Sequence, residues 1–132
     1  MGQPAAKQGD KIIATDTHII MNPSPGGPVP TPIPHLFNGI INGNLSNNVN
    51  IMGMPAATQG STADNMPPHI PQGAGPFQKP PSNKAQIMMG SATVMINNKP
   101  AARNGDTALT CNDPVDLAIG KIIAVGTVMI GG

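Results

Sequence analysis

Residues 93–106 carry the pattern that recurs along the whole chain, and they read Thr93-Val94-Met95-Ile96-Asn97-Asn98-Lys99-Pro100-Ala101-Ala102-Arg103-Asn104-Gly105-Asp106. Val94 and Ile96 alternate with Met95, which is the two-residue periodicity of a β-strand. Asn97-Asn98 predicts a tight turn, because asparagine tolerates positive φ better than other non-glycine residues. Pro100 ends the strand, since proline cannot donate a backbone hydrogen bond. The segment therefore predicts a short strand, a turn and a Pro-Ala-Ala-x-x-Gly-Asp corner.

Two more copies of the corner occur in the chain, so that the three run from Pro4 to Asp10, from Pro55 to Ser61 and from Pro100 to Asp106. The corners lie 51 and 45 residues apart. The first corner has no strand ahead of it, but the last segment of the chain, residues 127–132, has the missing sequence. If the end of the sequence is placed before its start, so that Gly132 is followed by Gln3, the joined segment matches the strand and turn of the third copy. This repetition predicts one supersecondary unit used three times, with the chain ends meeting inside the first unit.

The three units predict one domain over residues 1–132, because a single short hairpin unit cannot bury its apolar face alone. Residues 127–132 complete the first repeat. We expect an all-β fold: a cone-shaped domain of short β-hairpins with pseudo-three-fold symmetry, whose Pro/Gly-rich loops converge at a metal-bound apex.

The composition limits the classes of function. The chain has no Trp or Tyr and only two Phe, so its core must consist of Ile, Val, Met, Leu and Ala. Its formal charge is +1, with no cluster of basic residues and no aromatic platform, which argues against nucleic acid as a partner. Only 10% of residues are charged, and weak repulsion between neighbours suits a protein that works in an assembly.

The opening of the chain has no signal-peptide pattern, so we expect assembly in the cytoplasm. The single cysteine, Cys111, excludes an intrachain disulfide and fits a reducing compartment. Residues 117–132 are too short to span a bilayer and include Lys121. We expect them to form a β-hairpin of residues 121–125 and 127–130, bent at Gly126.

Two proline-rich segments interrupt the strand patterns. Residues 11–20 predict a strand, residues 22–34 an extended polyproline-like loop, and residues 67–81 a second proline-rich loop. Residues 86–89 are expected to pair with residues 92–96. No segment has helical periodicity of useful length.

The histidines and the cysteine give the most specific chemical signal. His18 follows Gly9 by nine residues and His69 follows Gly60 by nine, so three-fold symmetry places the two imidazoles at equivalent points. Cys111 follows the third corner by a shorter segment. Three imidazoles and one thiolate make a closed tetrahedral zinc site of the structural kind.

The sequence therefore predicts a metal site of His18, His35, His69 and Cys111. His35 has no symmetric counterpart, and Asp16 or Asp64 is an alternative fourth ligand. The competing interpretation is that the histidines are solvated or hydrogen-bonded and that the cysteine is a small buried apolar residue.

Pro100-Ala101-Ala102-Arg103, followed by Asn104-Gly105-Asp106, resembles the motif of the PAAR-repeat family, and the resemblance extends over essentially the whole chain. Lys7 and Thr58 stand where arginine is expected, and Ser61 replaces aspartate. The resemblance implies a small β-rich cone that sits on a trimeric β-helical spike at the tip of a contractile injection machine, such as a type VI secretion system or a phage-tail-like particle. It also implies a structural zinc ion near the apex, held by His18, His69, Cys111 and His35.

The expected function is non-enzymatic capping and sharpening of that spike for membrane puncture. The partners would be one spike trimer, cargo or effector proteins, and transiently the target membrane. An enzyme would need Cys111 with His69 as nucleophile and base, with no evident carboxylate to orient them. A free-standing zinc-binding interaction module or effector adaptor is the other alternative.

The matching strands contain the pairs Val49/Ile51, Val94/Ile96 and Val128/Ile130, which share one face. We expect that face to be core, and the alternative is docking on the spike by strand addition. The residues expected to contact the partner are then the turn positions Met52, Asn97 and Gly131.

Overall fold

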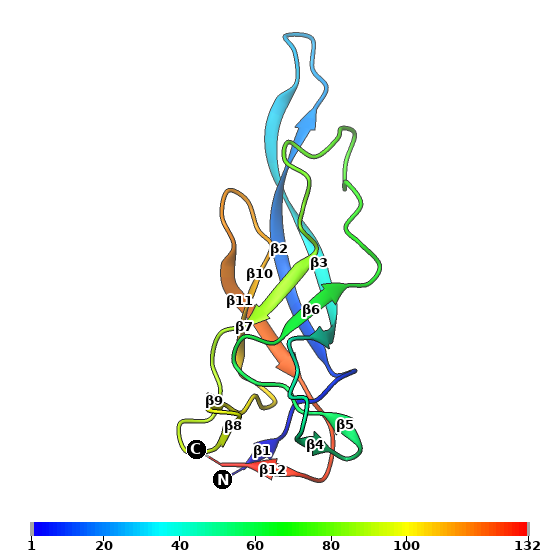
Figure 1. Cartoon of the computed structure of the whole chain (residues 1–132). Coiled ribbons are helices and arrows are strands. Elements are labelled where there is room, and N and C mark those ends of the chain that lie inside the picture. Colours follow the sequence, from blue (N-terminus) through cyan, green and yellow to red (C-terminus); the bar gives the residue numbers. More distant parts are fainter. Residues whose placement is uncertain (1, 132) are drawn as a thin grey trace.

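The computed structural model describes residues 2–131, and within that range every regular element is a β-strand (Figure 1). The strands are β1 (Gln3–Pro4), β2 (Lys11–Asn22), β3 (Val29–Gly43), β4 (Asn50–Ile51), β5 (Met54–Pro55), β6 (Thr62–Asn65), β7 (Lys84–Ile87), β8 (Met95–Ile96), β9 (Lys99–Pro100), β10 (Thr107–Thr110), β11 (Leu117–Ile123) and β12 (Met129–Ile130). The all-β prediction is confirmed. Gly132, the predicted end of the closing strand, lies outside the described residues.

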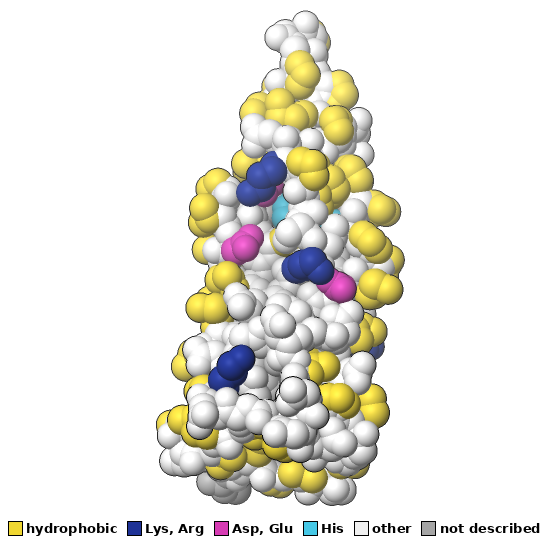
Figure 2. All heavy atoms as spheres, in the orientation of Figure 1, with side chains coloured by type: hydrophobic (Ala, Val, Ile, Leu, Met, Phe, Trp, Pro, Cys, Tyr) yellow, Lys and Arg dark blue, Asp and Glu magenta, His cyan; other side chains and the backbone are white. Residues whose placement is uncertain are grey.

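The body of the molecule is a closed antiparallel barrel with the strand order β10-β11-β2-β3-β6-β7. Its longest pair is β2 with β3, which are in register from Lys11↔Ile40 to Asn22↔Val29. This hairpin rises above the other strands and forms the narrow end, so that the molecule tapers like a cone (Figures 1 and 2). The cone-like β domain expected from the sequence is therefore present.

The wide end consists of three two-stranded ribbons, β1–β12, β4–β5 and β8–β9. In the β8–β9 ribbon, Ile96 pairs with Lys99 across Asn97 and Asn98, whose φ values are 53° and 66°. Two residues with positive φ are what a type I′ hairpin turn requires. The β1–β12 ribbon joins the two ends of the chain, with Gln3 opposite Ile130.

A ring of backbone hydrogen bonds joins the three corners. Each bond runs from the second alanine of one corner to the second alanine of another: Ala6 N to Ala102 O (2.9 Å), Ala102 N to Ala57 O (3.1 Å) and Ala57 N to Ala6 O (3.0 Å). All three alanines are fully buried. A larger side chain would have no space here, which explains the alanine pair in each corner.

The apolar core has two parts. Inside the barrel, β2, β3, β7 and β11 contribute Ile12, Phe37, Ile41, Ile87 and Ile122. At the wide end, Ile51, Ile96 and Ile130 pack together with the first alanines of the corners. The isoleucines of the shared strand face therefore belong to the core.

The prediction that residues 22–34 form a loop was wrong from Val29 onward, because these residues are the first part of β3. Pro30, Pro32 and Pro34 alternate along the strand. Backbone groups of successive residues in a strand point to opposite sides, so all three prolines lack the N–H on the same edge. That edge faces away from β2 and is unpaired with β6 until Gly39.

Two predicted pairings were also wrong. Residues 86–89 do not pair with residues 92–96, because β7 pairs with β6 and β10, and β8 pairs with β9. Likewise β11 joins β10 and β2 in the barrel, whereas β12 joins β1. Gly90 lies between β7 and β8, and Gly126 lies between β11 and β12, so the chain passes there from the barrel to the wide end. A glycine whose sequence context predicts a hairpin turn can thus mark the point where the chain crosses from one sheet to another.

Within residues 2–131 the structure has no helix of the length and apolar character needed to cross a membrane.

Candidate metal centre

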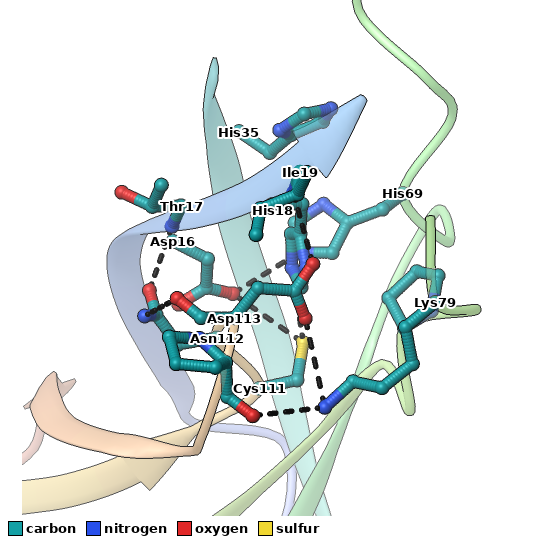
Figure 3. A network of polar contacts seen from close by, with 12 residues as sticks. Asp16, Thr17, His18, Ile19, His35, His69, Lys79, Cys111, Asn112 and Asp113 are labelled. Carbon is teal, nitrogen blue, oxygen red and sulfur yellow. Dashed lines mark hydrogen bonds and ion pairs between the residues drawn. The ribbon is translucent and has the colours of Figure 1, made fainter. Parts of the chain in front are cut away.

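The centre lies where β2 continues past the residues that pair with β11 in the barrel. β2 alternates in burial, and its inward positions include Asp16 and His18, two residues apart on one face. His69 comes from the segment between β6 and β7, and Cys111 directly follows β10. One ligand atom from each of these four residues lies within 4.8 Å of all the others. Figure 3 shows their side chains pointing toward one another.

Three separations between these atoms are close to those around a tetrahedral ion. His69 Nε2 lies 3.1 Å from Asp16 Oδ2, and Cys111 Sγ lies 3.5 Å from the same oxygen. His18 Nε2 lies 3.7 Å from Cys111 Sγ. Bonds of about 2.0–2.3 Å at tetrahedral angles separate two ligands by about 3.3–3.8 Å. The donor set of one thiol, two imidazoles and one carboxylate is therefore compatible with a zinc-like ion.

Burial shifts the pKa values of His18 and Cys111. The side chains of His18, His69 and Asp16 are 1%, 2% and 0% exposed. Burial lowers the pKa of His18, which keeps its imidazole neutral and able to bind a metal. Burial, and next the charge of Asp16, raise the pKa of the Cys111 thiol to about 12. In the absence of a cation the thiol is thus protonated at neutral pH.

His35 lies beside the group and not within it. Its ring centroid is 5.4 Å from that of His18 and 5.6 Å from that of His69. Nδ1 donates to Ile33 O at 2.8 Å, and Nε2 accepts from Gln72 N at 3.1 Å. Both ring nitrogens therefore have partners, and the assignment of His35 as the fourth ligand stays a prediction.

Asp16 and Asp64, the two alternatives for the fourth ligand, lie in different parts of the structure. Asp16 is paired with His35 in the β2–β3 register and has Thr110 Oγ1 at 2.5 Å from its Oδ1. Asp64 is on the outside of β6, where it contacts Asn42 and Lys84. The sequence signal for Asp16 is its spacing from His18, which puts both side chains on one face of a strand. Asp113, which lies behind His18, was not foreseen.

The three predicted partner contacts lie on the turns of the wide end. Each of them also forms a hydrogen bond to a neighbouring repeat. Met52 Sδ accepts from Thr127 N at 3.5 Å, and Asn97 Nδ2 donates to Asn48 Oδ1 at 2.8 Å. Gly131 O accepts from Ser91 Oγ at 2.5 Å. These links form a second ring around the wide end. The partner contact itself stays a prediction.

The order Cys111, His18, Asp113 is also that of a thiol nucleophile, its base and an orienting carboxylate. The sequence alone does not indicate a carboxylate next to a histidine. Activation of a nucleophile requires a lowered thiol pKa and access for a substrate. Cys111 has a raised pKa and is buried, so the geometry favours a ligand over a nucleophile.

A comparison with curated proteins gave no match. The family model described as the PAAR motif matches residues 20–116 and, in a second match, residues 77–132. The matched segments include the corners at residues 55–61 and 100–106, which take part in the ring of alanine hydrogen bonds. The buried group of two histidines, a cysteine and an aspartate is compatible with a metal site in such a protein. The chain therefore belongs to the PAAR-motif family.

Proposed function

We propose that this protein is the non-enzymatic tip of a contractile injection system. One copy caps the trimeric β-helical spike, sharpens it for membrane puncture, and holds a structural zinc ion. The observation that carries this proposal is the ring of three backbone hydrogen bonds among Ala6, Ala57 and Ala102, which gives a monomer a three-fold wide end. A monomer with this symmetry can meet three identical chains with equivalent contacts.

The surface of the wide end supports the same role. Met95 on β8 and Met129 on β12 occupy equivalent ribbon positions and are 56% and 57% exposed. Met52 is 53% exposed on the turn of the third ribbon. Flexible apolar side chains in a ring around the axis suit a docking face on an apolar partner.

Below the narrow end, a metal ion would join segments that are far apart in the sequence. His18 on β2, His69 before β7 and Cys111 after β10 would be ligands, with Asp16 as the fourth in this geometry. Zinc bound by four protein side chains leaves no position for a substrate and contributes to folding energy. Axial force on the β2–β3 hairpin would then pass to the whole barrel through these ligands.

The cellular route follows from this role. We propose that the protein assembles on the spike in the cytoplasm and then travels with the particle, with or without cargo proteins, into or across the target envelope. The scarcity of charged side chains toward the narrow end supports contact with a membrane (Figure 2).

The test is co-expression of the full chain with a trimeric β-helical spike protein, followed by native mass spectrometry. We expect a complex of one tip with three spike chains. Photo-reactive residues at positions 52, 95 and 129 should each cross-link to the spike, whereas position 115 on the side of the cone should not. Cross-linking at position 115 alone, or no complex, would rule out the capping role.

A free-standing zinc-binding module or effector adaptor is the second candidate, favoured by the buried ligand group alone. It predicts stoichiometric zinc in the purified protein together with no complex in the same experiment.

A further inference from the structure

A carboxylate lies directly behind the metal centre. Asp113 Oδ2 is 3.5 Å from His18 Nδ1, and the two side chains are 3% and 1% exposed. The other ring nitrogen, Nε2, is directed at Cys111 Sγ. His18 thus lies between the ligand group on one side and the Asp113 carboxylate on the other (Figure 3).

Asp113 is held in this position by the backbone of the strand that carries His18. Its Oδ2 accepts from Ile19 N at 2.9 Å, and its own N–H donates to Thr17 O at 2.8 Å. The side chain of Asn112 accepts from Thr17 N at 2.7 Å. The residues on both sides of His18 are therefore bonded to this segment, which fixes the carboxylate relative to the ring.

Two buried atoms at this contact have no hydrogen-bond partner among the described residues: His18 Nδ1 and Asp113 Oδ1. A buried polar atom without a partner is costly, so a hydrogen bond from His18 Nδ1 to Asp113 Oδ2 would be favourable. A neutral imidazole carries one proton, and the nitrogen that binds a metal must lack it. If Nε2 is the ligand atom, the proton belongs on Nδ1, and Asp113 Oδ2 lies 3.5 Å from that nitrogen.

We propose that Asp113 is a positioning residue of the metal centre, which accepts the Nδ1 proton of His18 and so leaves Nε2 free to bind the ion. This inference rests on the metal site of the proposed function and adds a residue to it that is not itself a ligand. A carboxylate behind a metal-binding histidine fixes both its tautomer and the orientation of its ring.

Lys79 provides the matched control. Its Nζ lies 3.6 Å from Asp113 Oδ1 and donates to Pro114 O at 3.2 Å, but its side chain is 57% exposed. It lines a cavity of about 80 Å³ that also borders His18 and Cys111. Lys79→Met removes a charge next to Asp113 and leaves the His18 contact intact. Asp113→Leu removes the acceptor.

The experiment uses the full chain with ¹⁵N-labelled histidine, with and without Zn²⁺, in wild type, Asp113→Leu, Asp113→Asn and Lys79→Met. NMR should show His18 protonated at Nδ1 in the wild type in both states. Asp113→Leu should lose this preference, and its Zn²⁺ affinity should fall by about 10–100-fold. Asp113→Asn should keep the tautomer, because its amide oxygen can accept the proton, and Lys79→Met should behave as wild type.

The proposal is overturned if wild-type His18 carries its proton on Nε2, a result that needs no variant to fold. It is also overturned if folded Asp113→Leu has the wild-type tautomer and affinity. A wild type that binds no Zn²⁺ contradicts the proposed metal site instead, and the tautomer of the metal-free protein still reports on the Asp113 contact.

Discussion

The backbone N–H of Arg103 donates to the carboxylate of Asp106 at 2.8 Å, and the backbone N–H of Asp106 returns to Arg103 O at 3.1 Å. The same double closure occurs in the other two corners: Lys7 with Asp10, and Thr58 with Ser61. The Thr58–Ser61 bond, at 3.0 Å, uses a hydroxyl oxygen in place of a carboxylate oxygen. Serine can therefore replace aspartate in the motif because the turn needs only an acceptor at this point.

Asp106→Ala should lower the free energy of unfolding by about 1–2 kcal/mol, because the partly buried N–H of Arg103 loses its acceptor. Asp106→Ser should cost clearly less, because Ser61 already fills this role in the second corner. Urea denaturation of the three proteins at equal metal content measures the difference. Equal losses for alanine and serine would show that the Arg103–Asp106 ion pair, and not the turn, matters.

Gly75→Ala should displace the segment that carries His69. A Cβ at Gly75 would lie 1.8 Å from Met21 O on β2, next to the hydrogen bond from Met21 N to Pro76 O. We expect a loss of about 2–3 kcal/mol in stability and weaker metal binding. Gly26→Ala is the control, because a Cβ there meets no atom within 4 Å. Thermal unfolding and Zn²⁺ titration of both variants test this, and equal behaviour would contradict it.

Metal uptake at pH 7 should release about one proton from the Cys111 thiol, because the pKa of the metal-free thiol is raised to about 12. His18 should release none, since its lowered pKa leaves it neutral. Affinity should therefore rise about tenfold per pH unit between pH 7 and 8. Calorimetry in buffers of different ionisation enthalpy counts the protons.

The same thiol gives the metal-free protein a pH dependence of stability. The folded pKa of about 12 lies above the ordinary value of 9.0, so the unfolded chain loses the proton first. Stability should be unaffected below pH 8 and should fall as the pH rises from 9 toward 12. Cys111→Ser should not show this decline.

Asp16→Asn should weaken Zn²⁺ binding more than His35→Gln. Asp16 Oδ2 belongs to the ligand group, whereas both nitrogens of His35 are used by Ile33 and Gln72. Co²⁺ absorption spectra of the two variants report the loss of a ligand directly. A larger effect of His35→Gln would assign the fourth position to His35.

Replacing Pro30, Pro32 and Pro34 together by valine should make the protein self-associate. The free edge of β3 then gains three N–H donors, and an exposed edge with donors and acceptors pairs with other strands. Thr31→Val is the control, because Thr31 pairs with Ile20 and its N–H faces β2. Light scattering after size exclusion should detect the oligomer, and a monomeric triple variant would contradict the protective role.

Much of the fold was accessible from the sequence because it depends on local rules. Asn97-Asn98 specified a two-residue turn, and the matching of residues 127–130 to the strand ahead of Pro100 indicated that the ends meet. The wrong pairings at Gly90 and Gly126 share one cause. Which strands pair in an antiparallel sheet depends on the tertiary structure. A glycine between two strand-like segments is therefore compatible both with a hairpin turn and with a crossing from one sheet to another.

By itself the sequence determined the three corners, the closure of the ring and the grouping of His18, His69 and Cys111, because repetition transfers local geometry from one copy to the next. Only the tertiary structure decided that Asp16 lies in the ligand group, that Asp113 lies behind His18, and that Val29 to Pro34 is strand. The first two features arise from contacts between β2 and segments far away in the chain, and the third arises from pairing with β2 across a short turn. The spacing of Asp16 from His18 places both side chains on one face of β2, but which distant segments meet that face depends on how the barrel closes.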